Sequence, residues 1–148
     1  ETLDYVDSSK FVTIGQSGGG TTSAFAGALD ERVQATIISG YYCSLFDSIF
    51  SLHHCGCNFV PNLLTCADLP EIVGIRAPKP TFIISGDLDG IFPQNGVKTA
   101  YHELQEIYDA AGAPDNLGID VWQGHGHEFR GDFAYPWLEK KLDINKSN

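Results

Sequence analysis

The sequence predicts one α/β domain, with a mostly parallel sheet of about four strands and helices on both faces. Short apolar segments rich in β-branched residues alternate along the chain with segments of helical periodicity. The apolar segments lack a regular alternation of polar and apolar residues, which is typical of strands covered on both faces. The chain has 148 residues, of which 43% are hydrophobic, and this length suits one core rather than two.

These patterns place the individual strands and helices. Strands are expected at residues 10–14, 33–39, 81–85 and 119–122. Helices are expected at residues 21–29, near 61–69, at 97–111 and at 133–142. The segment 97–111 has the clearest apolar face, because its apolar residues recur every three or four positions, and Gly112 is expected to end this helix.

Charge and composition exclude several classes of partner. Nine basic residues against 19 acidic residues give the chain a net charge of −10, so neither nucleic acid nor an anionic membrane is expected to bind. No apolar run approaches the roughly 20 residues that span a bilayer. The chain contains no Met and begins at Glu1, from which we expect a processed product or a piece of a longer protein. The sequence does not indicate a localisation.

A glycine-rich turn follows the first expected strand. Residues Gly15-Gln16-Ser17-Gly18-Gly19 match the Gly-x-Ser-x-Gly pattern, which raises a serine hydroxyl above the sheet between a strand and a helix. Gly15 and Gly19 are expected where a Cβ would clash, and the Gly18 N–H is a candidate oxyanion donor. The pattern predicts Ser17 as a nucleophile; the alternative is a turn with an incidental serine.

A serine nucleophile needs a base and an acid that orients the base. Asp87 and Asp89 follow the third expected strand, and His125 and His127 follow the fourth. The carboxyl ends of parallel strands meet at one edge of the sheet, so these residues are expected near Ser17. The order serine, aspartate, histidine is that of the α/β-hydrolases.

Four sequence runs carry a more specific resemblance, namely IGQSGGG, HHCGCNFVP, SGDLDGIFP and GHGHEF. They resemble the carboxyl-terminal half of bacterial acetyl xylan esterase-like α/β-hydrolases, close to the dienelactone hydrolase and prolyl oligopeptidase groups. The resemblance implies a partial α/β-hydrolase fold whose upstream strands are missing. It also selects Asp89 over Asp87 and His127 over His125. Dienelactone hydrolases proper carry Cys where this chain has Ser17, which argues against their activity.

The resemblance implies a serine carboxylic-ester hydrolase that needs no metal or organic cofactor and acts on small acyl esters or acetylated carbohydrate. Ser17, His127 and Asp89 would form the triad, with Gly18 in the oxyanion hole. The family's second oxyanion donor lies in an upstream loop that this chain does not contain, so the site is expected to be incomplete here. The alternatives are a serine peptidase of the prolyl oligopeptidase type and a non-catalytic fragment or assembly module.

The segment 41–76 interrupts the rhythm of strands and helices and is expected to be an insertion or a cap over one end of the sheet. Its aromatic residues Tyr41 and Tyr42, together with Gln16, are candidate substrate contacts, although the pattern favours core packing for the tyrosines at least as strongly. An edge strand at 10–14 is open to pairing. We therefore expect a homodimer or association with a missing amino-terminal half.

Four cysteines fall within this segment, at positions 43, 55, 57 and 66. The run His53-His54-Cys55-Gly56-Cys57 places thiols and imidazoles together, but structural zinc sites usually space their cysteines by two to four residues. No metal is therefore expected. A disulfide is a second alternative, and buried or pocket-lining thiols are the preferred interpretation.

Overall fold

The computed structural model describes residues 3–144 and contains one parallel four-stranded sheet. The strands lie side by side in chain order, and each neighbouring pair is parallel. This confirms the predicted fold class. The strands are β1 (Phe11–Gln16), β2 (Val33–Ser39), β3 (Thr81–Gly86) and β4 (Leu117–Trp122).

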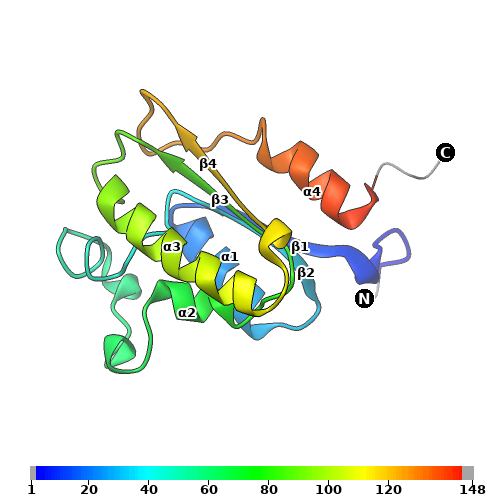
Figure 1. Cartoon of the computed structure of the whole chain (residues 1–148), viewed down its shortest axis with the longest axis horizontal. Coiled ribbons are helices and arrows are strands. Elements are labelled where there is room, and N and C mark those ends of the chain that lie inside the picture. Colours follow the sequence, from blue (N-terminus) through cyan, green and yellow to red (C-terminus); the bar gives the residue numbers. More distant parts are fainter. Residues whose placement is uncertain (1–2, 145–148) are drawn as a thin grey trace.

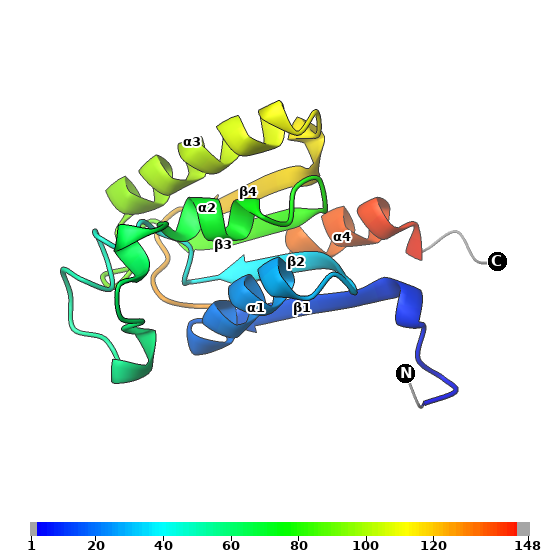
Figure 2. The same ribbon diagram turned by 90° about the horizontal axis from the view of Figure 1, so that it is seen from below.

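Helices cover both faces of the sheet, as predicted (Figures 1 and 2). Three of them, α1 (Gly18–Leu29), α2 (Leu69–Gly74) and α3 (Gln94–Ala110), pack on one face, and α4 (Ala134–Leu142) packs on the other. The inner strand β2 contributes side chains to the cores on both faces of the sheet. Ile38 packs in the core beneath α1 and α3, whereas its neighbour Ile37 packs in the core beneath α4.

The prediction of a helix near residues 61–69 is wrong. A short 3₁₀ turn occupies Leu63–Thr65, and α2 begins only after Asp68. Asp68 forms a capping box with Glu71, in which the Asp68 carboxylate accepts from the Glu71 N–H and the Glu71 carboxylate accepts from the Asp68 N–H. The Asp68 carboxylate also accepts from the Leu69 N–H. Pro70 stands in the first turn, where a proline costs no helical hydrogen bond. These signals fix the start of the helix at the end of the expected range.

The other helices end within one residue of the expected positions, whereas α1 and α3 each begin three residues earlier than expected. Gly112 follows α3 with φ +69°, the left-handed conformation that ends a helix. Pro136 lies in the first turn of α4. None of the described helices is long and apolar enough to cross a bilayer.

The segment between β2 and α2 runs as irregular loops past the carboxyl ends of the strands (Figure 1). Its only regular pieces are 3₁₀ turns at Gly56–Asn58 and Leu63–Thr65. Since α2 packs against α1 and α3, the last part of the expected insertion belongs to the helical layer of the domain. The loops therefore form one wall at the edge where the predicted catalytic residues gather.

Strand β1 lies at one edge of the sheet. Among residues 3–144, it pairs only with β2, and Ile14 on this strand is 41% exposed. The edge is available for pairing with another strand. The expected dimer, or association with an amino-terminal half, stays a prediction.

Candidate active site

Ser17 occupies a strained turn between β1 and α1. Its backbone has φ 56° and ψ −117°, a combination that L-residues rarely adopt. Two backbone hydrogen bonds hold it there: the Ser17 N–H donates to the Ser39 carbonyl at 2.9 Å, and the Thr21 N–H donates to the Ser17 carbonyl at 2.9 Å. The surrounding structure thus enforces the sharp turn that the Gly-x-Ser-x-Gly pattern predicts.

The glycines around Ser17 differ in what they allow. A Cβ at Gly15 would overlap the Gly19 carbonyl group, as expected. The expectation for Gly19 is wrong, because a Cβ there has nothing within 4 Å. Gly20 is the restricted position instead, since its Cβ would lie 2.8 Å from the Tyr41 Cβ and 2.9 Å from the Ser39 carbonyl oxygen. Gly20 is the glycine of the first helical turn that faces the end of β2.

Gly18 begins α1 and lines the same cleft as Ser17. The first N–H groups of a helix have no carbonyl partner within the helix, and the helix dipole adds partial positive charge at this end. The position therefore suits stabilisation of a negatively charged oxygen.

The structure brings Asp89 and His127 together from the loops after β3 and β4. Asp89 Oδ2 lies 2.8 Å from His127 Nδ1. Asp89 is 4% exposed, and its Oδ1 accepts from the N–H groups of Ile91 at 3.0 Å and Phe92 at 3.2 Å. The carboxylate is thus held by two backbone donors while its second oxygen orients the imidazole.

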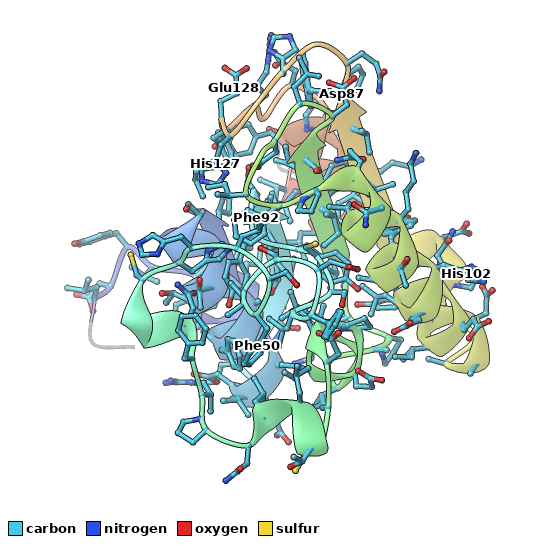
Figure 3. The ribbon with its side chains drawn as sticks, turned by 90° about the vertical axis from the view of Figure 1, so that its left-hand side faces the viewer. Phe50, Asp87, Phe92, His102, His127 and Glu128 are labelled. Carbon is cyan, nitrogen blue, oxygen red and sulfur yellow. The ribbon has the colours of Figure 1, made fainter. Side chains whose placement is uncertain are left out.

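Asp87 and His125 have other partners. Asp87 Oδ1 accepts from the N–H groups of Gly124 at 2.7 Å and His125 at 3.3 Å, which ties the two loops to each other. His125 Nδ1 lies 2.5 Å from Glu128 Oε1. Figure 3 shows Asp87 and Glu128 near the tips of these loops, beyond His127 and Phe92.

His127 lies close to the turn that carries Ser17. Its ring stacks on Phe92, with centroids 5.7 Å apart, and Phe92 lines the Ser17 cleft (Figure 3). Gly40, at the end of β2, has φ +53°, and a Cβ there would lie 3.1 Å from His127 Cε1 and 2.5 Å from Gln16 Nε2. His127 Cε1 therefore lies close to Gly40, the residue that follows β2 beside the serine turn.

The cleft itself has a volume of about 280 Å³. Cys55 and Cys57 line it, in agreement with the preferred interpretation of pocket-lining thiols, whereas the walls formed by His53, His54 and Asn58 and by Ile91 and Phe92 were not predicted. Only the aromatic and apolar character of the segment after Asp89 hinted at a wall there. The lining residues are Ser17, Gly18, Tyr41, His53, His54, Cys55, Cys57, Asn58, Ile91 and Phe92.

Of the three candidate substrate contacts, only Tyr41 lines the cleft. Burial raises the pKa of Tyr41, so its hydroxyl stays protonated as a potential donor. The expectation for Tyr42 is wrong: it is 1% exposed and its hydroxyl donates to the Ala100 carbonyl at 2.8 Å within the core. Gln16 is not among the lining residues either. Its Oε1 accepts from Ser39 Oγ at 2.5 Å, and this bond connects the serine turn to the end of β2.

The four cysteines are all free thiols, and no disulfide joins them within the described part of the chain. Cys43 is buried, whereas Cys55, Cys57 and Cys66 are exposed. In residues 3–144, no group of three or more histidine, cysteine or carboxylate side chains is arranged to hold a metal ion. The His53–Cys57 run forms a wall of the cleft instead.

Burial raises the pKa of the Cys43 thiol to about 12, and the charges of Asp47 and Asp68 add to this effect. Since the thiolate is the reactive form, iodoacetamide at pH 8 is expected to modify Cys55, Cys57 and Cys66 while Cys43 stays unmodified. Mass spectrometry of the peptides measures each site. Unfolding in urea should expose Cys43 to the reagent, and its rapid modification in the folded protein would contradict the prediction.

Known proteins resemble this chain in sequence and in fold. No protein-family model matches the chain. The chain is 30% identical over 137 residues to the "Putative hydrolase YtaP" of Bacillus subtilis (strain 168), covering 84% of this chain and 44% of that protein. The chain thus spans less than half the length of this curated relative.

Solved esterase structures share the same architecture. A carbohydrate esterase family 15 glucuronoyl esterase from Caldicellulosiruptor kristjansonii matches with a TM-score of 0.77 and 18% identity, covering 97% of this chain and 46% of that one. A "putative acetyl xylan esterase" from Bacteroides fragilis matches with a TM-score of 0.76 and 18% identity, covering 96% and 45% of the two chains. Together with the parallel sheet and the serine turn, these matches show that the chain has part of the α/β-hydrolase fold.

Proposed function

We propose that this chain carries the catalytic site of a serine carboxylic-ester hydrolase of the acetyl esterase type. The observation that carries the proposal is the 2.8 Å contact between His127 Nδ1 and Asp89 Oδ2 beside the cleft that contains Ser17. The strained backbone of Ser17 supports its role as nucleophile. The similarity to proteins named as a hydrolase and as esterases supports ester hydrolysis.

The geometry supports the following role for each residue. Asp89 accepts the Nδ1 proton of His127, which leaves Nε2 as the nitrogen that takes the Ser17 proton. Ser17 Oγ then attacks the ester carbonyl, and the protonated His127 returns the proton to the leaving alcohol. Water, activated by the same imidazole, hydrolyses the acyl-enzyme. The Gly18 N–H donates to the oxyanion of each tetrahedral intermediate.

The size and lining of the cleft support a small acyl group. A volume of about 280 Å³, partly enclosed by Tyr41 and Phe92, suits an acetyl ester of a compact alcohol such as a sugar. The net charge of −10 gives no support for a polyanionic substrate. Acetylated carbohydrate is therefore the substrate class that we propose.

A fluorophosphonate probe tests the proposal, because only an activated serine reacts rapidly with it. The probe is expected to label Ser17, as located by peptide mass spectrometry, and to leave a Ser17→Ala variant unlabelled. A panel of acetyl esters and aminoacyl amides, tested on the complete gene product, should show turnover of the esters alone. Labelling at another serine, or cleavage of the amides in preference to the esters, would reject the proposed function.

A further inference from the structure

Two histidines, His53 and His54, line the cleft together with Ser17, and His54 is the less exposed of the two. His54 comes from the irregular segment after β2 and is half-buried in the cleft wall. The edge of its ring packs against Phe92, with centroids 5.3 Å apart, and the ring of Phe92 in turn stacks on His127. Phe92 therefore contacts both imidazoles, one belonging to the proposed triad and one without a role in it.

The hydrogen bonds of Ser48 fix which nitrogen of His54 carries the proton. Ser48 is fully buried, and its Oγ lies 2.5 Å from the Ile91 carbonyl oxygen and 3.0 Å from His54 Nε2. A carbonyl oxygen only accepts, so the single hydroxyl proton of Ser48 goes to Ile91. The Ser48 oxygen must then accept from His54 Nε2–H. In the neutral ring, Nδ1 is left with a lone pair.

The charge state and the surroundings of His54 agree with this arrangement. Burial lowers the pKa of His54, and the neighbouring His53 and His127 lower it further, against the opposing effects of the Ile91 carbonyl and Asp89. The ring is therefore neutral at pH 7. Within residues 3–144, the side-chain hydrogen bond of His54, with Ser48, involves Nε2, and no side-chain donor contacts Nδ1. Nδ1 is thus an acceptor without a protein donor, on a side chain that lines the cleft.

We propose that His54 is a specificity-determining residue whose Nδ1 accepts a hydrogen bond from a hydroxyl group of the substrate. This inference rests on the proposed esterase function and adds a selection to it. An ester with a hydroxyl at the matching position satisfies the acceptor, whereas its deoxy counterpart displaces water from Nδ1 and leaves it unpaired. A site that is built to bind a hydroxyl discriminates against the analogue that lacks one.

The same short segment organises both histidines, which supports a shared task. Asp89 holds His127, and two residues later the Ile91 carbonyl orients Ser48, which holds His54. Phe92 then fills the space between the two rings. The acceptor nitrogen is thereby kept at a defined position relative to the proposed triad, as a specificity contact requires.

The test combines variants of the protein with variants of the substrate. Methyl xyloside monoacetates, each lacking one hydroxyl in turn, are compared with the parent ester on the complete gene product. In the unchanged protein, one deoxy position is expected to raise KM about tenfold with little effect on kcat. His54→Phe keeps a ring of similar size and should abolish that difference. His102→Phe, on the exposed side of α3 and remote from the cleft, is the control and should keep it (Figure 3).

A second variant and a spectroscopic readout separate a substrate contact from a structural role. Ser48→Ala keeps the imidazole but releases its tautomer, so the discrimination should fall below that of the unchanged protein without vanishing. Nitrogen-15 NMR of the ring should show Nε2–H for His54 in the unchanged protein and a tautomer mixture in Ser48→Ala. An Nδ1–H tautomer in the unchanged protein, or equal discrimination before and after His54→Phe, would overturn the inference.

The two proposals fail in different ways. A protein that hydrolyses none of the monoacetates and whose Ser17 resists the fluorophosphonate rejects the esterase function, and with it the role of His54. A protein that hydrolyses the parent and every deoxy ester equally well retains the esterase function and rejects the role of His54 alone.

Discussion

Asp89→Asn is expected to slow the reaction of Ser17 by about 10⁴-fold, because an amide nitrogen in place of Oδ2 would donate toward His127 Nδ1 and force the proton onto Nε2. His127 could then no longer accept the serine proton. The fold should survive, since the amide oxygen can still accept from the Ile91 and Phe92 N–H groups. The rate of fluorophosphonate capture measures the effect without depending on the choice of ester.

Asp87→Asn is the matched control. Asp87 Oδ1 accepts only backbone N–H groups from the loop after β4, and an amide oxygen can replace it in both contacts. Capture by this variant should stay within about tenfold of the unchanged protein, which corresponds to about 1.4 kcal/mol. Equal losses in the two variants would show that the loop, rather than the Asp89–His127 pair, controls the serine.

Gly15→Ala is expected to lower the free energy of unfolding by about 4 kcal/mol. The new Cβ would overlap the Gly19 carbonyl, which belongs to the backbone of α1 and cannot rotate away. Domains of this size are stable by only about 5–15 kcal/mol, so much of the stability would be lost together with the shape of the serine turn. Urea unfolding monitored by circular dichroism measures the change.

Gly19→Ala isolates the steric cause. A Cβ at Gly19 meets nothing within 4 Å, and alanine is the better residue inside a helix. The stability of this variant should therefore lie within about 1 kcal/mol of the unchanged protein. A large loss at Gly19 together with a small loss at Gly15 would show that the turn is arranged differently.

Short-range sequence patterns were enough to predict the strands of the sheet and the turn at Ser17 that follows β1. Each strand was predictable because apolar, β-branched residues form it and turn residues bound it, as in Val33–Ser39, where the expected and observed ranges coincide. The turn at Ser17 was predictable because the steric requirement for glycine at position 15 comes from Gly19, only four residues away. Parallel pairing then brings the loops with Asp89 and His127 to the edge of Ser17, because all four strands point the same way.

Contacts between distant segments account for what the sequence did not reveal. Tyr41 and Tyr42 are adjacent and chemically alike, yet one lines the cleft and the other lies beneath α3, a choice made by the direction of the chain after β2. Likewise, Gly20 is restricted by Tyr41 and Ser39 rather than by its sequence neighbours. The proposed role of His54 depends on its hydrogen bond with Ser48 and on the bond from Ser48 to the Ile91 carbonyl, and no sequence pattern predicts these contacts.

The hydrogen bonds between the loops after β3 and β4 affect the entropy cost of ligand binding. The Asp87 N–H donates to the Trp122 carbonyl at 3.0 Å and the Leu88 N–H to the His125 carbonyl at 2.8 Å, while a Cβ at Gly86 would overlap the Gly126 carbonyl. The conformational entropy of aligning two residues 38 positions apart is therefore lost when the domain folds, not when the ligand arrives. Binding free energy remains available for orienting the ester against an already rigid acid–imidazole pair.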